Sequence, residues 1–447
     1  MANQVSMPLY QDLLNGFDNW VAMEQTGTQP VLQLRKEAIE QFRALGFPTR
    51  KVEDWKYTSV QPFLQDAFEV NPALMEAAGH APVALDKATI EELDAYKLVL
   101  VNGKFQPALS DNTLPTSIKI KSILEAQEEP AFQQNFGKQV NTGKYHFAAL
   151  NTALFADGLF IEVPANVVLD KPLHIVQIYS GTANLFIQPR NLVVVNRSAA
   201  IDIVESVTSE NPGATLFVNS VSEVVVKENA QVNHYHLQTA GEGVRLVGHT
   251  EVSQKRDSVY SNYTFTLPGA ELVRNNVNLN LDDEHTESHL YGLYLVAGRQ
   301  LTDNHTLVNH LHPHCESNEV YKGVLLDNAT GVFNGKIFVE VDAQKTNAFQ
   351  QNNNLLLSNK ATINSKPQLE IFADDVKCSH GSTVGQLSKE SMFYLQSRGI
   401  SEETARRMLV SAFAFDVTQN IKIEALEDHI NNLITKHIPA QQELVKA

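Results

Sequence analysis

Residues 221–237 read VSEVVVKENAQVNHYHL, and this stretch contains the pattern that decides the fold. Two short runs, 221–226 and 232–237, are rich in β-branched and aromatic residues, and the segment between them, 227–231, contains Ala230. Such runs, separated by a polar turn segment and without a helical period, are typical of strands. The stretch therefore predicts two strands joined by a short turn.

The same pattern continues in both directions, from about residue 150 to about residue 380. No amphipathic helical period of any length interrupts the series. A mainly β core is therefore predicted for residues 151–383. The strand-like runs include 159–163, 174–178, 192–195, 200–204 and 369–372.

Small residues recur at the predicted turns of this region at intervals of 27 to 40 residues. They are Ala200, Ala230, Ala270, Ala297, Ala329 and Ala361. A quasi-period near 30, with two or three short strands in each interval, is typical of a β-solenoid whose coils bury their apolar positions against one another. A two-sheet sandwich needs only about 100 residues and would account for less than half of the region. A β-helix is the favoured prediction.

Helical patterns flank this core. Residues 1–95 are predicted as an N-terminal helical region, 96–150 as a mixed connecting region with a hairpin at Asn102 and Gly103, and 384–447 as a C-terminal helical domain. Ser388 and Ser401 are expected to cap helices, and Gly399 to end one. The predicted apolar faces are Leu13, Leu14, Phe17 and Val21; Leu34, Ala38, Phe42 and Leu45; Ala405, Met408, Leu409, Ala412 and Phe413; and Ile423, Leu426, Ile430, Leu433 and Ile434.

Composition excludes several classes of partner. The chain has 447 residues with 35 Lys plus Arg against 51 Asp plus Glu, a formal net charge of −16. Without a basic run, such a chain lacks the cations that dominate binding to nucleic acids and anionic membranes. The sequence has no apolar stretch near the roughly 20 residues that span a bilayer and no leader pattern, so we expect a cytoplasmic protein.

Two groups of His and Cys residues are candidate metal-binding sites. His310, His312 and His314 alternate, so in an extended strand all three would project from one face, with Cys315 on the other, and could bind zinc or iron. Pro313 weakens this interpretation because it removes a ladder donor, and solvent-facing imidazoles on a loop are the commoner explanation.

Cys378 and His380 form the second group. Their spacing places a thiol and an imidazole on one strand face, where they could engage iron or sulfide. Two ligands cannot complete an iron–sulfur cluster, which normally takes four, and a purely structural pair remains the alternative. The sequence has no phosphate-binding P-loop, because the segment from Gly331 to Lys336 has the wrong spacing.

The run PQLEIFADDVKCSHGSTVG at 367–385, continued by FYLQSRGI at 393–400, resembles the signature of the SufB/SufD family of iron–sulfur cluster assembly proteins. The segment EDWKYT at 53–58 is a further match, and the KCSHG form resembles the SufD branch. One departure is Ser382, where the family usually has Ala. Shorter matches lie at 150–151, 321–323, 333–336, 343–344 and 353–358.

This resemblance implies a right-handed parallel β-helix flanked by helical domains. It also implies a non-enzymatic scaffold subunit that pairs with SufB and the SufC ATPase, so that the partner hydrolyses ATP. In the family's motif, the position of His380 acts in cluster formation at the interface with SufB, with Cys378 beside it. A transient cluster or iron shared with SufB is implied, rather than a permanently bound cofactor.

The C-terminal helices are expected to dock the ATPase, with Arg406 and Arg407 on the docking surface. Without partners the chain could form a homodimer. Two enzyme hypotheses stay open: a polysaccharide-processing β-helix, which would need clustered Asp, Arg or Lys along one coil face, and a metal-dependent oxygenase or isomerase built on His310, His312 and His314.

Overall fold

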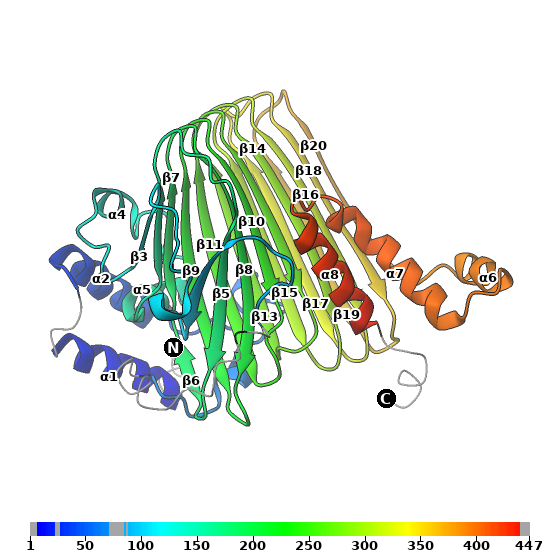
Figure 1. The fold of residues 1–447 in the computed structure, drawn as a ribbon, viewed down its shortest axis with the longest axis horizontal. Coiled ribbons are helices and arrows are strands. Elements are labelled where there is room, and N and C mark those ends of the chain that lie inside the picture. The colour runs from blue at the N-terminus through cyan, green and yellow to red at the C-terminus, as the bar shows by residue number, and fades with distance from the viewer. Residues whose placement is uncertain (1–6, 23–26, 71–84, 86–87, 439–447) are drawn as a thin grey trace.

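The structure is a computed structural model and describes residues 7–22, 27–70, 85 and 88–438. Two large β-sheets that face each other form most of the molecule (Figure 1). From β4 onward, successive elements of the chain mostly alternate between the sheets, and parallel pairs link one coil to the next. A sandwich of two hairpin-connected sheets would give antiparallel neighbours instead. The predicted β-helix is confirmed as a β-solenoid of about eight turns, with no helix between β4 and β20.

The strands of the first sheet, in spatial order, are β2 (Lys104–Phe105), β1 (Tyr96–Val101), β5 (Leu173–Ser180), β8 (Ala200–Glu210), β10 (Gln231–Gln238), β12 (Val259–Thr266), β14 (Glu287–Val296), β16 (Glu316–Leu325), β18 (Asn347–Leu356) and β20 (Lys377–Gly385). Those of the second sheet are β19 (Thr362–Ile371), β17 (Thr330–Val339), β15 (Leu301–His310), β13 (Leu272–Leu281), β11 (Val244–Gln254), β9 (Leu216–Val226), β7 (Arg190–Val195), β4 (Leu159–Val163) and β3 (Lys119–Ser122), and β6 (Leu185–Ile187) pairs with β9.

One corner of the solenoid explains the repeat. Where the chain passes from the second sheet to the first, each coil has a residue with positive φ, followed by a small buried residue that fills the corner. The amide of Ser198, for example, donates to the carbonyl of Glu228 one coil further on, at 2.9 Å. The positive-φ residues are Asn166, Ser198, Asn229, Asp257, His285, His314 and Lys345, and the small ones include Ala199, Ala230, Ser258, Thr286, Cys315 and Thr346.

The repeat inferred from the sequence mixed two corners. Ala200 and Ala230 lie at the corner just described, whereas Ala270, Ala297, Ala329 and Ala361 lie at the opposite one, where the chain returns to the second sheet. This switch accounts for the single long interval of 40 residues. The true period, measured between the positive-φ residues of one corner, is 28 to 32 residues.

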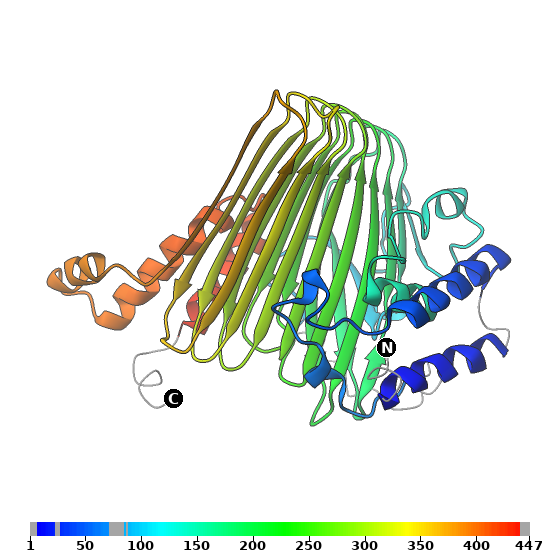
Figure 2. The ribbon, with the colours of Figure 1, turned by 180° about the vertical axis from the view of Figure 1, so that it is seen from behind.

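The N-terminal helices pack at the first coils of the solenoid, on the outer side of the second sheet (Figure 2). The predicted apolar faces are largely confirmed, because Leu13, Leu14, Phe17, Ala38 and Phe42 are buried there. The part of the helical prediction at 71–84 lies outside the described residues. The elements of this region are α1 (Pro8–Ala22), α2 (Gln29–Leu45), η1 (Glu53–Trp55), η2 (Gln61–Leu64), η4 (Pro107–Leu109), α4 (Pro130–Asn135) and α5 (His146–Leu154).

The EDWKYT segment is held on the second sheet by a buried charge. The Thr58 hydroxyl donates to the Asp303 carboxylate, and Arg274 forms an ion pair with the same carboxylate. The Arg274 guanidinium lies 3.8 Å from the Trp55 ring centroid. Trp55 is therefore a core residue, whereas Tyr57 is exposed.

Helices α6 (Lys389–Ser397), α7 (Glu402–Thr418) and α8 (Glu424–His437) follow the solenoid. The Ser388 and Ser401 hydroxyls accept hydrogen bonds from Ser391 N and Thr404 N, and Gly399 has φ +83°, so the predicted helix boundaries are confirmed. Helices α7 and α8 pack on the outer face of the first sheet, while α6 extends away from the body (Figure 1).

The buried face of α7 differs from the predicted one. Val410, Ala414 and Val417 are buried with Ala405, whereas Met408 is exposed. Residues 408–415 are apolar on almost every side of the helix, so either face could be buried, and contact with the sheet selects the smaller side chains. On α8, the predicted Leu426, Ile430 and Ile434 are buried.

The predicted hairpin is also confirmed, since Asn102 and Gly103 have φ +51° and +78° between β1 and β2. Positive φ at both central residues is the requirement of a tight hairpin turn. Among the described residues, no helix combines the length and the apolar character that crossing a membrane requires.

Candidate functional site

The last coil of the solenoid contains both Cys378 and His380. β20 is the last strand of the first sheet and β19 the last strand of the second, so each has one edge with which no strand among the described residues pairs. Such an edge presents backbone N–H and C=O groups that can pair with another chain. The coil also has exposed apolar side chains at Ile371, Phe372 and Val384.

Strand register places both candidate residues on the inward face of β20. Cys378 pairs with Ala348 on β18, and His380 pairs with Gln350. Ala348 and Gln350 are buried in the solenoid, and paired residues on parallel strands point to the same side of the sheet. The sequence prediction that Cys378 and His380 share a face therefore agrees with this geometry, and the shared face is the interior one.

The two side chains differ in their surroundings. Cys378 is partly buried and packs with Ile337, Val339 and Ala373, and burial raises the pKa of its thiol. His380 is exposed, because no further coil of the described residues covers it. The His380 imidazole is thus accessible at the surface, while the Cys378 thiol is held in its protonated form at neutral pH.

Polar contacts join the two sheets beside His380. The Ser365 hydroxyl on β19 lies 2.8 Å from the Ser382 hydroxyl and donates to Asn352 Oδ1 at 2.7 Å. Asn352 is fully buried and is also bonded by Asn354. Ser382, the departure from the family pattern, is therefore a bridge that closes the end of the solenoid.

A buried carboxyl group, that of Glu319, lies two strands away from His380 at the same register position of the first sheet. Glu319 on β16 pairs in register with Gln350, which pairs with His380. The Glu319 carboxyl accepts hydrogen bonds from Gln350 Nε2 at 2.7 Å and from the Thr306 hydroxyl at 2.5 Å. Burial raises the pKa of Glu319 to about 7, so this carboxyl gains or loses its proton near neutral pH.

We expect Glu319→Gln to remove a pH dependence of stability. The pKa of Glu319 is about 7 when folded and 4.5 when exposed, so the stability that this carboxyl contributes is complete below pH 4.5 and is lost as the pH rises through 7. The amide of the Glu319→Gln variant does not ionise, so the variant loses no stability from this position as the pH rises. At pH 8 the variant should be more stable by roughly 3 kcal/mol at most, and near pH 4.5 the difference should vanish.

Calorimetric melting temperatures at several pH values test this expectation. Glu316→Gln, at an exposed position on the same strand, is the matched control and should differ from the wild type by a small, constant amount. Parallel pH profiles of the wild type and Glu319→Gln would contradict the titration assigned to Glu319.

The expectation that His310, His312 and His314 share one face is wrong. His310 is the last residue of β15, fully buried, and its Nε2 lies 2.9 Å from the Ser317 hydroxyl. His312 and His314 are exposed in the following turn, where His314 occupies the positive-φ corner position. Because the strand ends before His312, alternation no longer applies, and the geometry behind the metal-enzyme hypothesis is lost.

Sequence reasoning did not single out another pair of alternating histidines, His234 and His236 in the opening stretch. These two, with Glu205, are the one group of three metal-ligating side chains found among the described residues. The usable signal was the H-x-H spacing inside a run already predicted as a strand. Glu205 could not be found that way because its proximity depends on register between β8 and β10.

Arg406 and Arg407 lie on α7 and form ion pairs with Glu402 and Glu403 one turn earlier. The Arg406 side chain is 17% exposed and borders a surface pocket with Phe393 and Leu357, whereas Arg407 is 39% exposed. Of the two predicted docking residues, Arg407 is the more accessible.

Comparison with known proteins gives matches along nearly the whole chain. The family model described as the SufBD core domain of the SUF iron–sulfur cluster assembly system matches residues 178–413, and that of the SufBD N-terminal region matches residues 7–175. An iron–sulfur cluster assembly SufBD family protein of Synechocystis is 34% identical over 92% of both chains. The SufD proteins of Escherichia coli, at 30% identity over 95% of this chain and 97% of the relative, and of Bacillus subtilis, at 26% over 91% and 93%, are also similar.

Proposed function

Because the chain belongs to the SufBD family of iron–sulfur cluster assembly proteins, we propose that it is a non-catalytic scaffold subunit of the cytoplasmic SUF assembly machinery. It pairs with a SufB-like subunit and a SufC-like ATPase, and the nascent cluster or its iron is shared with the SufB-like subunit. The observation that carries this proposal is the last coil: His380 lies there on an interior face, between two strand edges that no other described residues cover.

The last coil suits pairing with a related solenoid. A partner strand added to β19 or β20 would continue a sheet, satisfy the free backbone groups and cover exposed Phe372 and Val384. His380 and Cys378 would then face the partner's side chains, which could supply the ligands that this chain lacks. In isolation, a second copy of this chain could use the same edges, which is the basis for a homodimer.

Coexpression with SufB-like and SufC-like proteins from the same genome, followed by size-exclusion chromatography, tests the assembly. We expect one peak that contains all three chains. Elution of this chain alone in every combination would contradict the proposed scaffold role.

In this proposal the SufC-like ATPase binds to the C-terminal helices. Helix α6 has no buried residue, and Phe393 and Tyr394 on it are 73% and 57% exposed. Met408 on α7 is exposed as well, and Arg407 lies one residue before it. This combination of apolar side chains and a cation on adjacent helices supports a docking surface of α6 and the first half of α7.

We expect Arg407→Glu and Phe393→Asp each to weaken ATPase binding on the order of tenfold or more, because both alter the centre of this surface. Neither should unfold the chain, since Arg407 forms only an exposed ion pair, worth about 0.3–0.5 kcal/mol. Pull-down with the SufC-like partner measures the effect, and the melting temperature checks the fold.

Lys436→Glu, at an exposed position of α8, is the control and should leave binding unchanged. Point substitutions are better than deletion of residues 388–447, because the deletion also uncovers Tyr235, Tyr263 and Leu293 on the solenoid. Full ATPase binding by the Arg407→Glu/Phe393→Asp double variant would place the docking surface elsewhere.

A further inference from the structure

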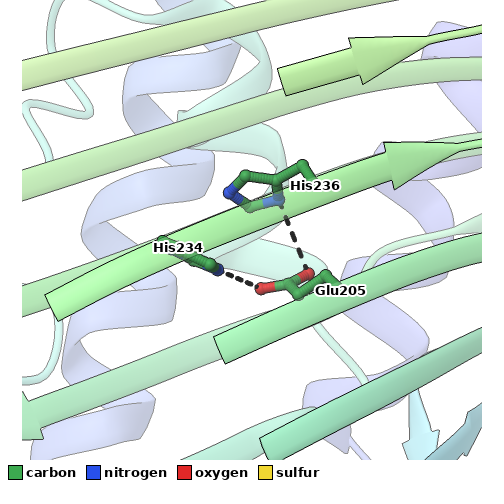
Figure 3. A group of neighbouring side chains, drawn as sticks. All are labelled: Glu205, His234 and His236. Carbon is green, nitrogen blue, oxygen red and sulfur yellow. Dashed lines mark hydrogen bonds and ion pairs between the residues drawn. The ribbon is translucent and has the colours of Figure 1, made fainter. Parts of the chain in front are cut away.

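Three metal-ligating side chains meet inside the solenoid, far from the last coil (Figure 3). Glu205 on β8 pairs in register with His236 on β10, and His234 precedes His236 by two residues on the same face. His234 Nε2 lies 2.8 Å from Glu205 Oε1, and His236 Nδ1 lies 3.9 Å from Glu205 Oε2. One ligand atom from each residue lies within 4.8 Å of the other two.

The Glu205 carboxylate has no permanent cation beside it. It is buried, and its ion pairs among the described residues are with the two imidazoles and with no Lys or Arg. A buried carboxylate whose ion-pair partners are imidazoles is favourably placed to bind a cation.

His236 also presents an unused nitrogen. Its Nε2 is buried and has no hydrogen-bond partner among the residues that the structure describes. The same side chain lines a cavity of about 60 Å³ between the two sheets, together with Glu205, Thr264 and Gln238. A polar cavity of this volume has room for a few water molecules or for the outer ligands of an ion.

The surrounding hydrogen bonds orient the ligand atoms. His234 Nδ1 lies 3.2 Å from the Tyr260 hydroxyl, which leaves Nε2 directed at Glu205. Gln177 Nε2 donates to Glu205 Oε2 at 2.7 Å, and the Tyr179 hydroxyl donates to Gln177 Oε1 at 2.7 Å. Such outer partners fix tautomer and orientation in protein metal sites.

We propose that Glu205, His234 and His236 bind one divalent transition-metal ion, of the Zn²⁺ or Fe²⁺ class, inside the solenoid. Two imidazoles and one carboxylate are a ligand set that these ions accept, with water in the adjacent cavity at the remaining positions. Ligand atoms around such an ion lie about 3.3 Å apart, so small rotations of the His236 and Glu205 side chains complete the site.

The site is separate from the proposed cluster interface. Five strand steps in the first sheet, from β10 to β20, separate His234 from His380, which corresponds to about 24 Å at the usual strand spacing. The metal-site proposal therefore does not depend on the partners or on cluster assembly, and it is tested with the purified chain alone.

Calorimetric titration of the chelator-treated full chain with Zn²⁺ is the direct test, repeated after refolding with Zn²⁺ present so that access to the interior is not limiting. We expect one equivalent to bind, and His236→Gln and Glu205→Gln each to weaken that binding on the order of 100-fold. Co²⁺ absorption in place of Zn²⁺ reports the ligand set, and its visible band should be lost in both variants.

The control is the double variant His285→Ala/His314→Ala, which removes an exposed pair of stacked imidazoles whose ring centroids are 5.1 Å apart. This variant should still bind one equivalent of Zn²⁺. If His236→Gln fails to fold, Zn²⁺ binding is measured instead as the rise in the melting temperature of the wild type when Zn²⁺ is added. The control variant should show the same rise. Binding that persists in His236→Gln, absence of any bound equivalent in the wild type, or loss of binding in the control would overturn the proposal.

Discussion

His380→Ala is expected to abolish iron–sulfur cluster maturation in a complementation assay while leaving folding and complex formation intact. The imidazole lies on the inward face of the last strand, where no coil in the described part of the chain covers it. Its loss should therefore change stability by no more than about 0.5 kcal/mol, as for other exposed positions. The same exposure leaves the imidazole accessible to the proposed partner subunit.

Cys378→Ser should be milder than His380→Ala. The Cys378 thiol is partly buried among aliphatic side chains and its pKa is raised, so it is a poorer ligand at neutral pH than an exposed imidazole. His312→Ala, at an exposed histidine of a turn, is the control and should mature clusters normally. A His380→Ala protein that melts several degrees lower yet still supports assembly would assign a structural role to His380.

Asp303→Ala is expected to destabilise the folded chain by about 3–5 kcal/mol, because it leaves the buried Arg274 charge without its partner. Burial opposes ionisation of Asp303, but Arg274 outweighs it, and with His305 and Thr58 lowers the pKa of Asp303 to about 2. The stabilisation is therefore complete above the ordinary Asp pKa and is lost as the pH falls toward 2.

Calorimetry at neutral pH measures this loss, and Trp fluorescence should report release of the EDWKYT segment, since Trp55 contacts Arg274. Asp94→Ala breaks an exposed ion pair with Lys171 and should cost at most about 1 kcal/mol. Equal melting temperatures for the two variants would show that the Asp303 ion pair does not hold the segment in place.

Local patterns predicted most of the secondary structure. The strand runs at 159–163 and 232–237, the hairpin at Asn102 and the caps at Ser388 and Ser401 all depend on residues close together in the chain. The buried face of α7 was assigned incorrectly, because its sequence offers two apolar faces and only the sheet surface selects one. Alternation also failed at His312, since a pattern alone does not show where a strand ends.

The candidate sites show the same difference between local patterns and tertiary contacts. By itself the sequence determined that the chain is a solenoid with helical ends and that Cys378 and His380 share a strand face, because coil length and side-chain alternation are local properties of the backbone. Only the tertiary structure decided that this face is the uncovered interior of the last coil, and that Glu205 meets His234 and His236. Those relations depend on the register between strands some 30 residues apart, which is set by how the stacked coils pack and which no short stretch of sequence encodes.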